Sequence, residues 1–150
     1  MTRRGLTLIL GLAALLLAAP MAQAQTAPAM PMRLVLKGYD PVAYFTDGKP
    51  TPGRPEFEIE FDRARYRFAS ADNMARFKAD PDQFAPQFAG SCAMGLSKGM
   101  KVEADPANWL IVDGKLFVFA GKAVPDAMHT NPAEMIGKAR ENWKTLASAP

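Results

Sequence analysis

The dipeptide Asp113-Gly114 constrains the fold of this chain more than any other feature. Mostly apolar residues flank it, at positions 109–112 and 115–119. An Asp-Gly pair tolerates the positive backbone angles of a type I′ turn, which is the turn that joins adjacent antiparallel strands. The sequence therefore predicts an antiparallel β-hairpin over residues 109–119.

A second hairpin is predicted upstream of the first. Apolar residues alternate with acidic ones over residues 56–62 and with arginines over residues 65–68, on either side of a turn at 62–64. Alternation with a period of two is typical of a strand with one buried face. Arginines that face glutamates across this hairpin would stabilise it by roughly 0.2–1 kcal/mol per pair.

Capping residues mark two helices. Ser70 is a good N-cap for a helix over residues 71–79, which ends at Asp80-Pro81. Residues 131–134 combine an N-cap asparagine, an N1 proline and an N3 glutamate, and apolar residues then recur on one helical face. We therefore expect an α+β fold, in which a small antiparallel sheet built from hairpins carries packed helices in a single domain. No internal repeat is apparent.

Residues 37–45, with the sequence KGYDPVAYF, are interpreted as a bend that leads into the opening strand of the domain. Gly38 can adopt backbone angles that other residues avoid, and Pro41 favours an extended Asp40. Residues 42–45 would then form a short apolar strand that ends in turn-forming residues.

Residues 1–24 are interpreted as a cleavable signal peptide. Arg3 and Arg4 form a basic start, residues 6–19 are apolar, and residues 22–24 supply the small-x-small cleavage pattern. The apolar run is shorter than the roughly 20 residues that a spanning helix needs, so we expect no membrane anchor after cleavage. The protein is then periplasmic or secreted, by general secretion or by the twin-arginine route.

The remaining chain is long enough for one domain. Residues 25–36 are interpreted as a mobile leader and residues 37–147 as the domain. The full chain has a formal net charge of +3, and loss of the two arginines in the signal lowers it to about +1. No basic run with interleaved aromatic residues remains, so we expect a small ligand or a protein partner and no nucleic acid.

Cys92 is the first candidate for chemistry. It is the only cysteine, so no disulfide can form within the chain. It lies in a stretch of small residues, 90–99, that allows close approach of the backbone to a neighbouring element or to a ligand. Two interpretations stay open for this thiol: a reactive group, or a small buried hydrophobic side chain.

His129 is the only histidine, which limits the enzyme and metal hypotheses. A thiol-dependent enzyme with Cys92 as nucleophile would use His129 as its base. A soft copper site would combine Cys92 and His129 with Met94 or Met128, although methionine also fills gaps in ordinary cores. We assign no catalytic residue, because the sequence has no serine triad, phosphate loop or paired histidines.

Several segments together resemble the YHS domain family, in its exported bacterial branch. These segments are residues 38–45, 66–70, 88–93, 105–109 and 112–116. The resemblance covers most of the chain from Gly38 to Trp143, although the Tyr-His-Ser triplet of the family name is not in this sequence. It implies a small accessory or ligand-binding domain.

Some members of this family resemble small metal-binding modules. Their motif places one cysteine after Asp-Pro-Val and another between the Phe and Ser at a strand end. The corresponding residues here are Ala43 and Ala69. Alanine has no donor atom, so the thiolate pair that would hold a transition metal is missing.

We therefore expect an exported, soluble domain that binds a small ligand or serves as an accessory module and does not catalyse a reaction. The candidate ligand site lies where the bend at Tyr39 and Asp40 meets Ser91 and Cys92. A copper site and a thiol-dependent enzyme remain alternatives. A third alternative is an interaction module whose partner binds the exposed face of the sheet.

Overall fold

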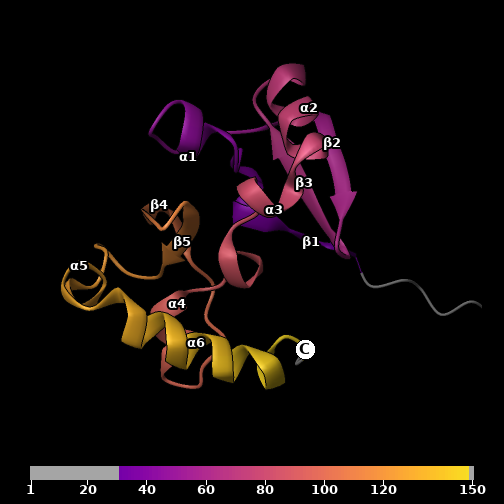
Figure 1. Ribbon diagram of the computed structural model, residues 1–150. Helices are drawn as coiled ribbons and strands as arrows, with labels where there is room; N and C mark the ends of the chain where they lie inside the picture. The colour runs from indigo at the N-terminus through magenta and orange to yellow at the C-terminus, as the bar shows by residue number, and fades with distance from the viewer. Residues whose placement is uncertain (1–30, 149–150) are drawn as a thin grey trace, which may run out of the picture. The chain divides into compact units, whose positions relative to one another are not determined.

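The computed structural model describes residues 31–148, so the predicted signal peptide and residues 25–30 of the predicted leader lie outside it. Pro31–Pro150 form one compact unit, in which six α-helices are combined with five strands over the described residues (Figure 1). The expected α+β class is thereby confirmed. Within residues 31–148, no helix is long and apolar enough to cross a bilayer.

The first hairpin is the one predicted from alternation. Strands β2 (Arg54–Phe61) and β3 (Ala64–Phe68) pair antiparallel, with Glu58 opposite Arg67 in the register. A third strand, β1 (Arg33–Leu34), pairs parallel to β3, so the sheet has the order β1-β3-β2.

The compact unit begins earlier than the predicted domain boundary at residue 37. Strand β1 lies within the range that we interpreted as leader, and so does the start of the turn η1 (Val35–Gly38). Val35 and Leu36 are both buried in the core. Residues 33–36 are therefore part of the fold.

The opening strand predicted over residues 42–45 is wrong. Ala43–Thr46 form a short helix, α1, and Val42 before it already has helical backbone angles. The cause is local: the Asp40 side chain accepts hydrogen bonds from the backbone N–H groups that start this turn. An Asp-Pro pair followed by small apolar residues is a helix-start pattern as well as a bend.

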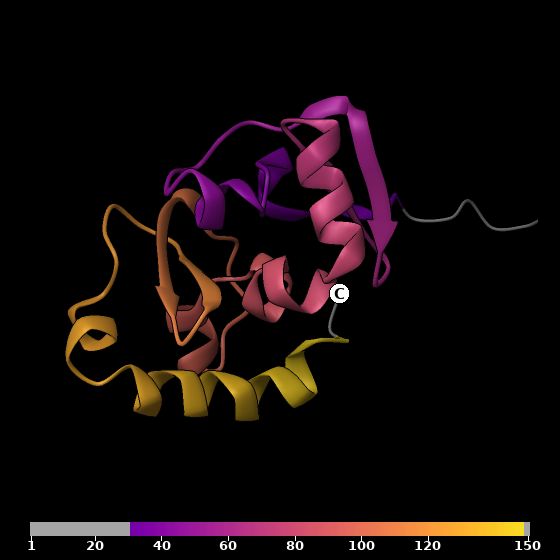
Figure 2. The same cartoon turned by 45° about the horizontal axis from the view of Figure 1, so that its top comes forward.

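Helix α2 (Ala71–Ala79) begins where the sequence predicts it. The Ser70 hydroxyl accepts a hydrogen bond from the Asn73 N–H at 3.2 Å. Figure 2 shows α2 lying along the first hairpin. Phe77 is the buried residue of α2 and packs against this hairpin. The aromatic rings around Phe77 are those of Phe61, Tyr66 and Phe68. A single turn, α3 (Pro81–Phe84), follows with Asp80 as its cap.

The hairpin predicted around Asp113-Gly114 is confirmed. Strands β4 (Asp105–Val112) and β5 (Lys115–Phe119) pair antiparallel, and both turn residues have positive φ, at 50° and 72°. The two strands form a sheet of their own. The predicted hairpins thus belong to two separate small sheets.

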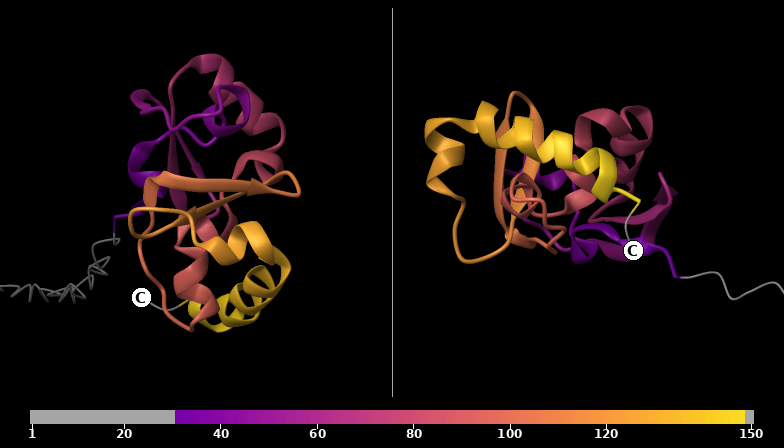
Figure 3. Two further views of the ribbon diagram at one scale, coloured as in Figure 1. Left: turned by 90° about the vertical axis from the view of Figure 1, so that its left-hand side faces the viewer. Right: turned by 90° about the horizontal axis from the view of Figure 1, so that it is seen from below.

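The last two helices are α5 (Asp126–Thr130) and α6 (Pro132–Leu146), and α6 starts at its predicted proline. The Asn131 side chain does not cap the backbone; its amide donates to Glu134 Oε2 at 3.2 Å. Helix α6 packs against α4 (Ala93–Ser97), and the left view of Figure 3 shows the two helices side by side.

The two halves of the unit repeat one arrangement, which the sequence did not reveal. A left-handed turn, a short helix and a hairpin follow one another as η1, α1, β2 and β3, and again as η2 (Gln87–Gly90), α4, β4 and β5. The two hairpins share one register, including the position of the bulge. Corresponding pairs are Arg54–Phe68 with Asp105–Phe119 and Glu58–Arg67 with Trp109–Val118. Few residue types are shared between the halves, so the repeat is one of backbone pairing.

Side chains join the two halves. The Tyr44 hydroxyl in α1 donates to the Pro106 carbonyl at 2.9 Å, and the Tyr44 ring meets Trp109 edge-on with centroids 5.2 Å apart. Burial raises the pKa of Tyr44 above its ordinary value. On another side, the Arg33 guanidinium donates to the Ala89 carbonyl. The core is therefore continuous across the repeat.

Candidate functional site

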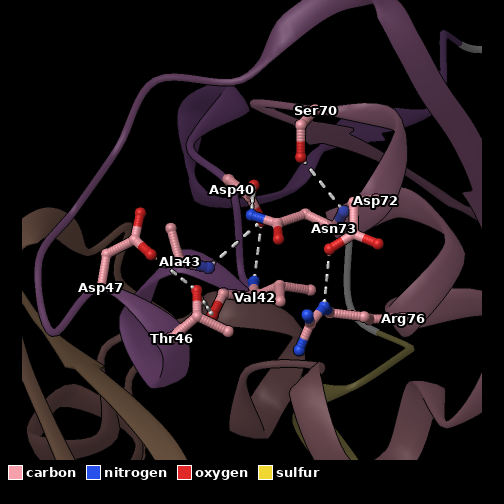
Figure 4. A network of polar contacts seen from close by, with 9 residues as sticks. All are labelled: Asp40, Val42, Ala43, Thr46, Asp47, Ser70, Asp72, Asn73 and Arg76. Carbon is pink, nitrogen blue, oxygen red and sulfur yellow. Dashed lines mark hydrogen bonds and ion pairs between the residues drawn. The ribbon is translucent and has the colours of Figure 1, made fainter.

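Asp40 is the most completely buried polar residue of the predicted site, with none of its surface exposed. Its Oδ1 accepts hydrogen bonds from the backbone N–H of Val42 at 2.8 Å and of Ala43 at 3.3 Å, at the start of α1 (Figure 4). A buried carboxylate is stable only when its charge is satisfied by such donors.

The second oxygen of Asp40 reaches two other elements. Its Oδ2 accepts from the backbone N–H of Ala69 at 2.8 Å, just after β3, and from the side-chain amide of Asn73 at 2.7 Å, in α2. One carboxylate thereby connects α1, the end of β3 and α2. Sequence reasoning included Asp40 as a ligand-binding candidate and missed Asn73, although Asn73 lies at a first-turn position of a helix whose cap was recognised.

The Asp40 carboxylate lies between the two positions at which metal-binding YHS members would carry cysteine. Ala43 and Ala69 both donate their backbone N–H groups to it, one to each oxygen. Their methyl groups offer no metal donor, and the four N–H groups engage the carboxylate. The residues present here do not fit a thiolate-bound metal at this position.

Tyr39 is half-buried, and its backbone forms an isolated antiparallel bridge with Pro52. Next to the bridge, the Gly53 N–H donates to the Gly38 carbonyl at 2.8 Å. A Cβ on Gly53 would lie 2.6 Å from Cβ of Arg67, so only glycine fits there. The Tyr39–Asp40 bend is therefore held by backbone contacts with the segment that contains Pro52 and Gly53.

Cys92 starts the corresponding helix in the second half. Its Sγ accepts a hydrogen bond from the Gly95 N–H at 3.4 Å and so caps α4, and its own N–H donates to the Val102 carbonyl at 2.9 Å. Cys92 is 3% exposed, and Ser91 beside it is buried as well, with an isolated bridge to Glu103. The thiol belongs to the core and serves as an N-cap.

Asp40 and Cys92 occupy corresponding places in the repeat. Each comes after a left-handed turn that ends in glycine, Gly38 with φ 88° and Gly90 with φ 74°, and each accepts a hydrogen bond from the backbone N–H three residues further on, at the start of a short helix. No hydrogen bond among the described residues joins the Tyr39–Asp40 pair to the Ser91–Cys92 pair. The predicted site is thus two equivalent helix starts, one in each half.

The other candidates for metal or catalysis lie around α4 and α5. Met128 is buried, Met94 is half-buried, and His129 is exposed on α5. Over residues 31–148, the structure contains no hydrogen bond from His129 to Cys92. Nor does that range hold a group of three or more His, Cys, Asp or Glu side chains positioned for a metal ion.

The charged face of the first hairpin is paired internally, as the sequence predicts. Glu58 accepts from Arg67 Nε at 2.6 Å and from Arg65 Nη1 at 3.2 Å. The hydrogen bond from Arg67 is the main cause that lowers the pKa of Glu58. Glu58, Arg65 and Arg67 are therefore paired with one another on the sheet face to which the partner of an interaction module would bind.

Comparison with known proteins gives a match that covers part of the first half of the repeat. No curated protein and no solved structure matches the chain. The model of the YHS domain family matches residues 42–88. That range contains α1, the first hairpin, α2 and α3, and it ends in η2, at the start of the second half of the repeat. The match supports assignment of this chain to the YHS domain family.

Proposed function

We propose that this protein is an exported accessory domain that binds a small ligand, catalyses no reaction and needs no metal to fold. The observation that carries this proposal is the Asp40 network. In place of a thiolate-bound metal, a carboxylate with four N–H donors holds together the elements around Ala43 and Ala69. A satisfied buried network of this kind rigidifies a core.

The positions of the reactive side chains support a role without catalysis. The Cys92 thiol is buried and used as a helix cap, whereas a nucleophilic thiolate needs access and an electropositive environment. His129, the base that a thiol enzyme would use, is exposed on α5. These positions favour a binding function.

Metal analysis of the protein purified from the periplasm, together with thermal unfolding with and without a chelator, tests the proposal. We expect no stoichiometric metal and the same Tm in both conditions, because the Asp40 network needs none. Stoichiometric copper in the wild type that is lost in Cys92→Ser would overturn the proposal in favour of the soft-metal alternative. A Tm that falls on chelation would also contradict it.

Export is tested separately by the mass of the mature protein. Cleavage after Ala24 predicts a periplasmic product whose first residue is Gln25. Full-length protein retained in the cytoplasm would contradict export and leave the binding proposal to be judged on the metal analysis.

A further inference from the structure

A groove runs beside the turn between β2 and β3, and no part of it belongs to the Asp40 network. It consists of two cavities of about 390 Å³ and about 250 Å³. The two cavities share Asp62, Ala89 and Trp143 as lining residues, so they are neighbours along one surface. Sites for small molecules have volumes of roughly 300–1,000 Å³. We call this surface the Trp143 groove.

Aromatic side chains line the smaller cavity of the Trp143 groove. They are Phe61, Tyr66, Phe88 and Trp143. Trp143 is half-buried and meets Phe88 edge-on with centroids 6.0 Å apart, which fixes the indole where both cavities meet. Burial raises the pKa of Tyr66 to about 12, so this ring stays neutral at physiological pH. The smaller cavity thus offers aromatic surface to a flat ring, beside the polar side chains of Asp62, Asp82 and Gln87.

The larger cavity is cationic. Its charged lining residues are Arg33, Arg63 and Lys101, with Asp62 as the one carboxylate among them. The Arg33 guanidinium donates to the carbonyls of Ala89 and Gly90 and is thereby held at the edge of the groove. Guanidinium groups are well suited to bind carboxylates and phosphates. An anionic group is therefore the ligand chemistry that this cavity favours.

Arg63 occupies a position that favours glycine. Its φ is 58°, in the left-handed region, and the corresponding position of the second hairpin is Gly114 with φ 72°. A side chain in this region carries a conformational cost that glycine avoids. The Arg63 side chain makes no hydrogen bond or ion pair with the residues that the structure describes, so no polar contact of this side chain offsets that cost.

Both edges of the Trp143 groove carry this strain. Asp62 and Arg63 form one edge, and Phe88 and Ala89, with φ of 56° and 49°, form the other. Non-glycine residues in sparsely populated backbone regions cluster at functional sites, where the surrounding fold holds them.

We propose that the Trp143 groove binds a small organic anion with a flat ring. The ring lies against Trp143 and Phe88, and the acidic group lies beside Arg33, Arg63 and Lys101. This inference rests on the proposed ligand-binding function and names the class of ligand. It is independent of whether the Asp40 network replaces a metal.

The test uses 1-anilinonaphthalene-8-sulfonate, a small anion with flat rings, and the mature protein with Trp109→Phe, in which Trp143 is the remaining tryptophan. We expect saturable binding with one probe per chain that quenches Trp143 emission and weakens as salt rises. Arg63→Gly should weaken binding about tenfold, as expected for loss of one charge-assisted contact. The same variant should raise Tm, because glycine relieves the left-handed turn.

Lys122→Gly is the matched control, because it removes one exposed cation that lines neither cavity. It should leave probe binding unchanged. The proposal is overturned by a folded protein that shows no saturable quenching of Trp143. Equal weakening in the Arg63→Gly and Lys122→Gly variants would overturn it too. Arg63→Gln provides a second variant that removes the charge but keeps a polar side chain in the left-handed position, and it should weaken probe binding without raising Tm. The metal analysis separates these outcomes from failure of the proposed function, since it does not depend on the groove.

Discussion

The Asp40 carboxylate and the Asn73 side-chain amide are joined by a 2.7 Å hydrogen bond that ties the start of α1 to α2. The two residues come from opposite ends of the first hairpin unit, and the backbone N–H of Ala69 binds the same oxygen. These hydrogen bonds connect the segment before the hairpin to the segment after it, in addition to the contacts of the apolar core.

Replacement of this carboxylate should destabilise the fold strongly. In Asp40→Asn, an amide N–H₂ takes the place of one acceptor oxygen and faces N–H groups that have no other partner. We expect a loss of about 2–4 kcal/mol in the free energy of unfolding, measured by urea denaturation. Asp47→Asn, an exposed aspartate just after α1, is the control and should change stability by less than about 0.5 kcal/mol. Similar losses in the two variants would contradict a special role for Asp40.

Two glycines should respond to alanine in opposite directions. Gly53→Ala would place a Cβ 2.6 Å from Cβ of Arg67 and 2.7 Å from the Gly38 carbonyl oxygen, so we expect a loss of roughly 1–3 kcal/mol or more. Gly137 lies inside α6 with no heavy atom within 4 Å of the added methyl group. Gly137→Ala should therefore stabilise the protein by about 0.5–1 kcal/mol. Calorimetric Tm values of both variants check the pair, and a stable Gly53→Ala protein would show that the close approach is not required.

The Cys92 thiol should react slowly in the folded protein. Because it is 3% exposed and engaged with the Gly95 N–H, a disulfide reagent reaches it only when the chain opens. If opening costs about 3 kcal/mol or more, labelling is slowed at least about 100-fold relative to protein in urea. Absorbance at 412 nm with Ellman's reagent measures both rates. Fast labelling of the native protein would favour the thiol-enzyme alternative.

The stability contributed by Glu58 should depend on pH. Its pKa is lowered in the folded protein from the ordinary 4.5, so its contribution is complete above that value and is lost as pH falls through the lowered pKa. Glu58→Gln should cost roughly 0.2–1 kcal/mol at pH 7, where the arginine pairs are intact, and less in acid. Chemical denaturation at pH 7 and pH 3 gives the comparison. Glu60→Gln is the control, since Glu60 is exposed and its pairing with Arg65 is one of register alone.

Much of the fold could be predicted because its signals are local. The turn at Asp113-Gly114, the alternation in the first hairpin and the cap at Ser70 each depend on a few adjacent residues. The short helix after Asp40 was misread because four residues are too few to show a helical period, and the Asp-Pro pair fits a bend as well. Strand β1 was missed because its two residues depend on a partner far away in sequence, β3.

The site was predictable only in part. Asp40 and Cys92 were recognised as polar or reactive groups near glycines, and both lie at helix starts. The correspondence between Asp40 and Cys92 could not be predicted, because one side chain is a carboxylate and the other a thiol. The repeat becomes visible only in the register of the paired strands. The Trp143 groove was missed for a similar reason, since its lining residues come from β1, the first hairpin turn, η2 and α6.

The repeated hairpins have a consequence for how the chain folds. Each is closed by a two-residue turn, so each brings together strands that are adjacent in sequence and loses little loop entropy. Contacts between the two halves join residues that are far apart in the sequence. The hydrogen bond from Tyr44 to Pro106, for example, joins residues 62 positions apart and is expected to form after the hairpins. We therefore expect that folding can start at either hairpin and that the docking of the two halves is the slow step.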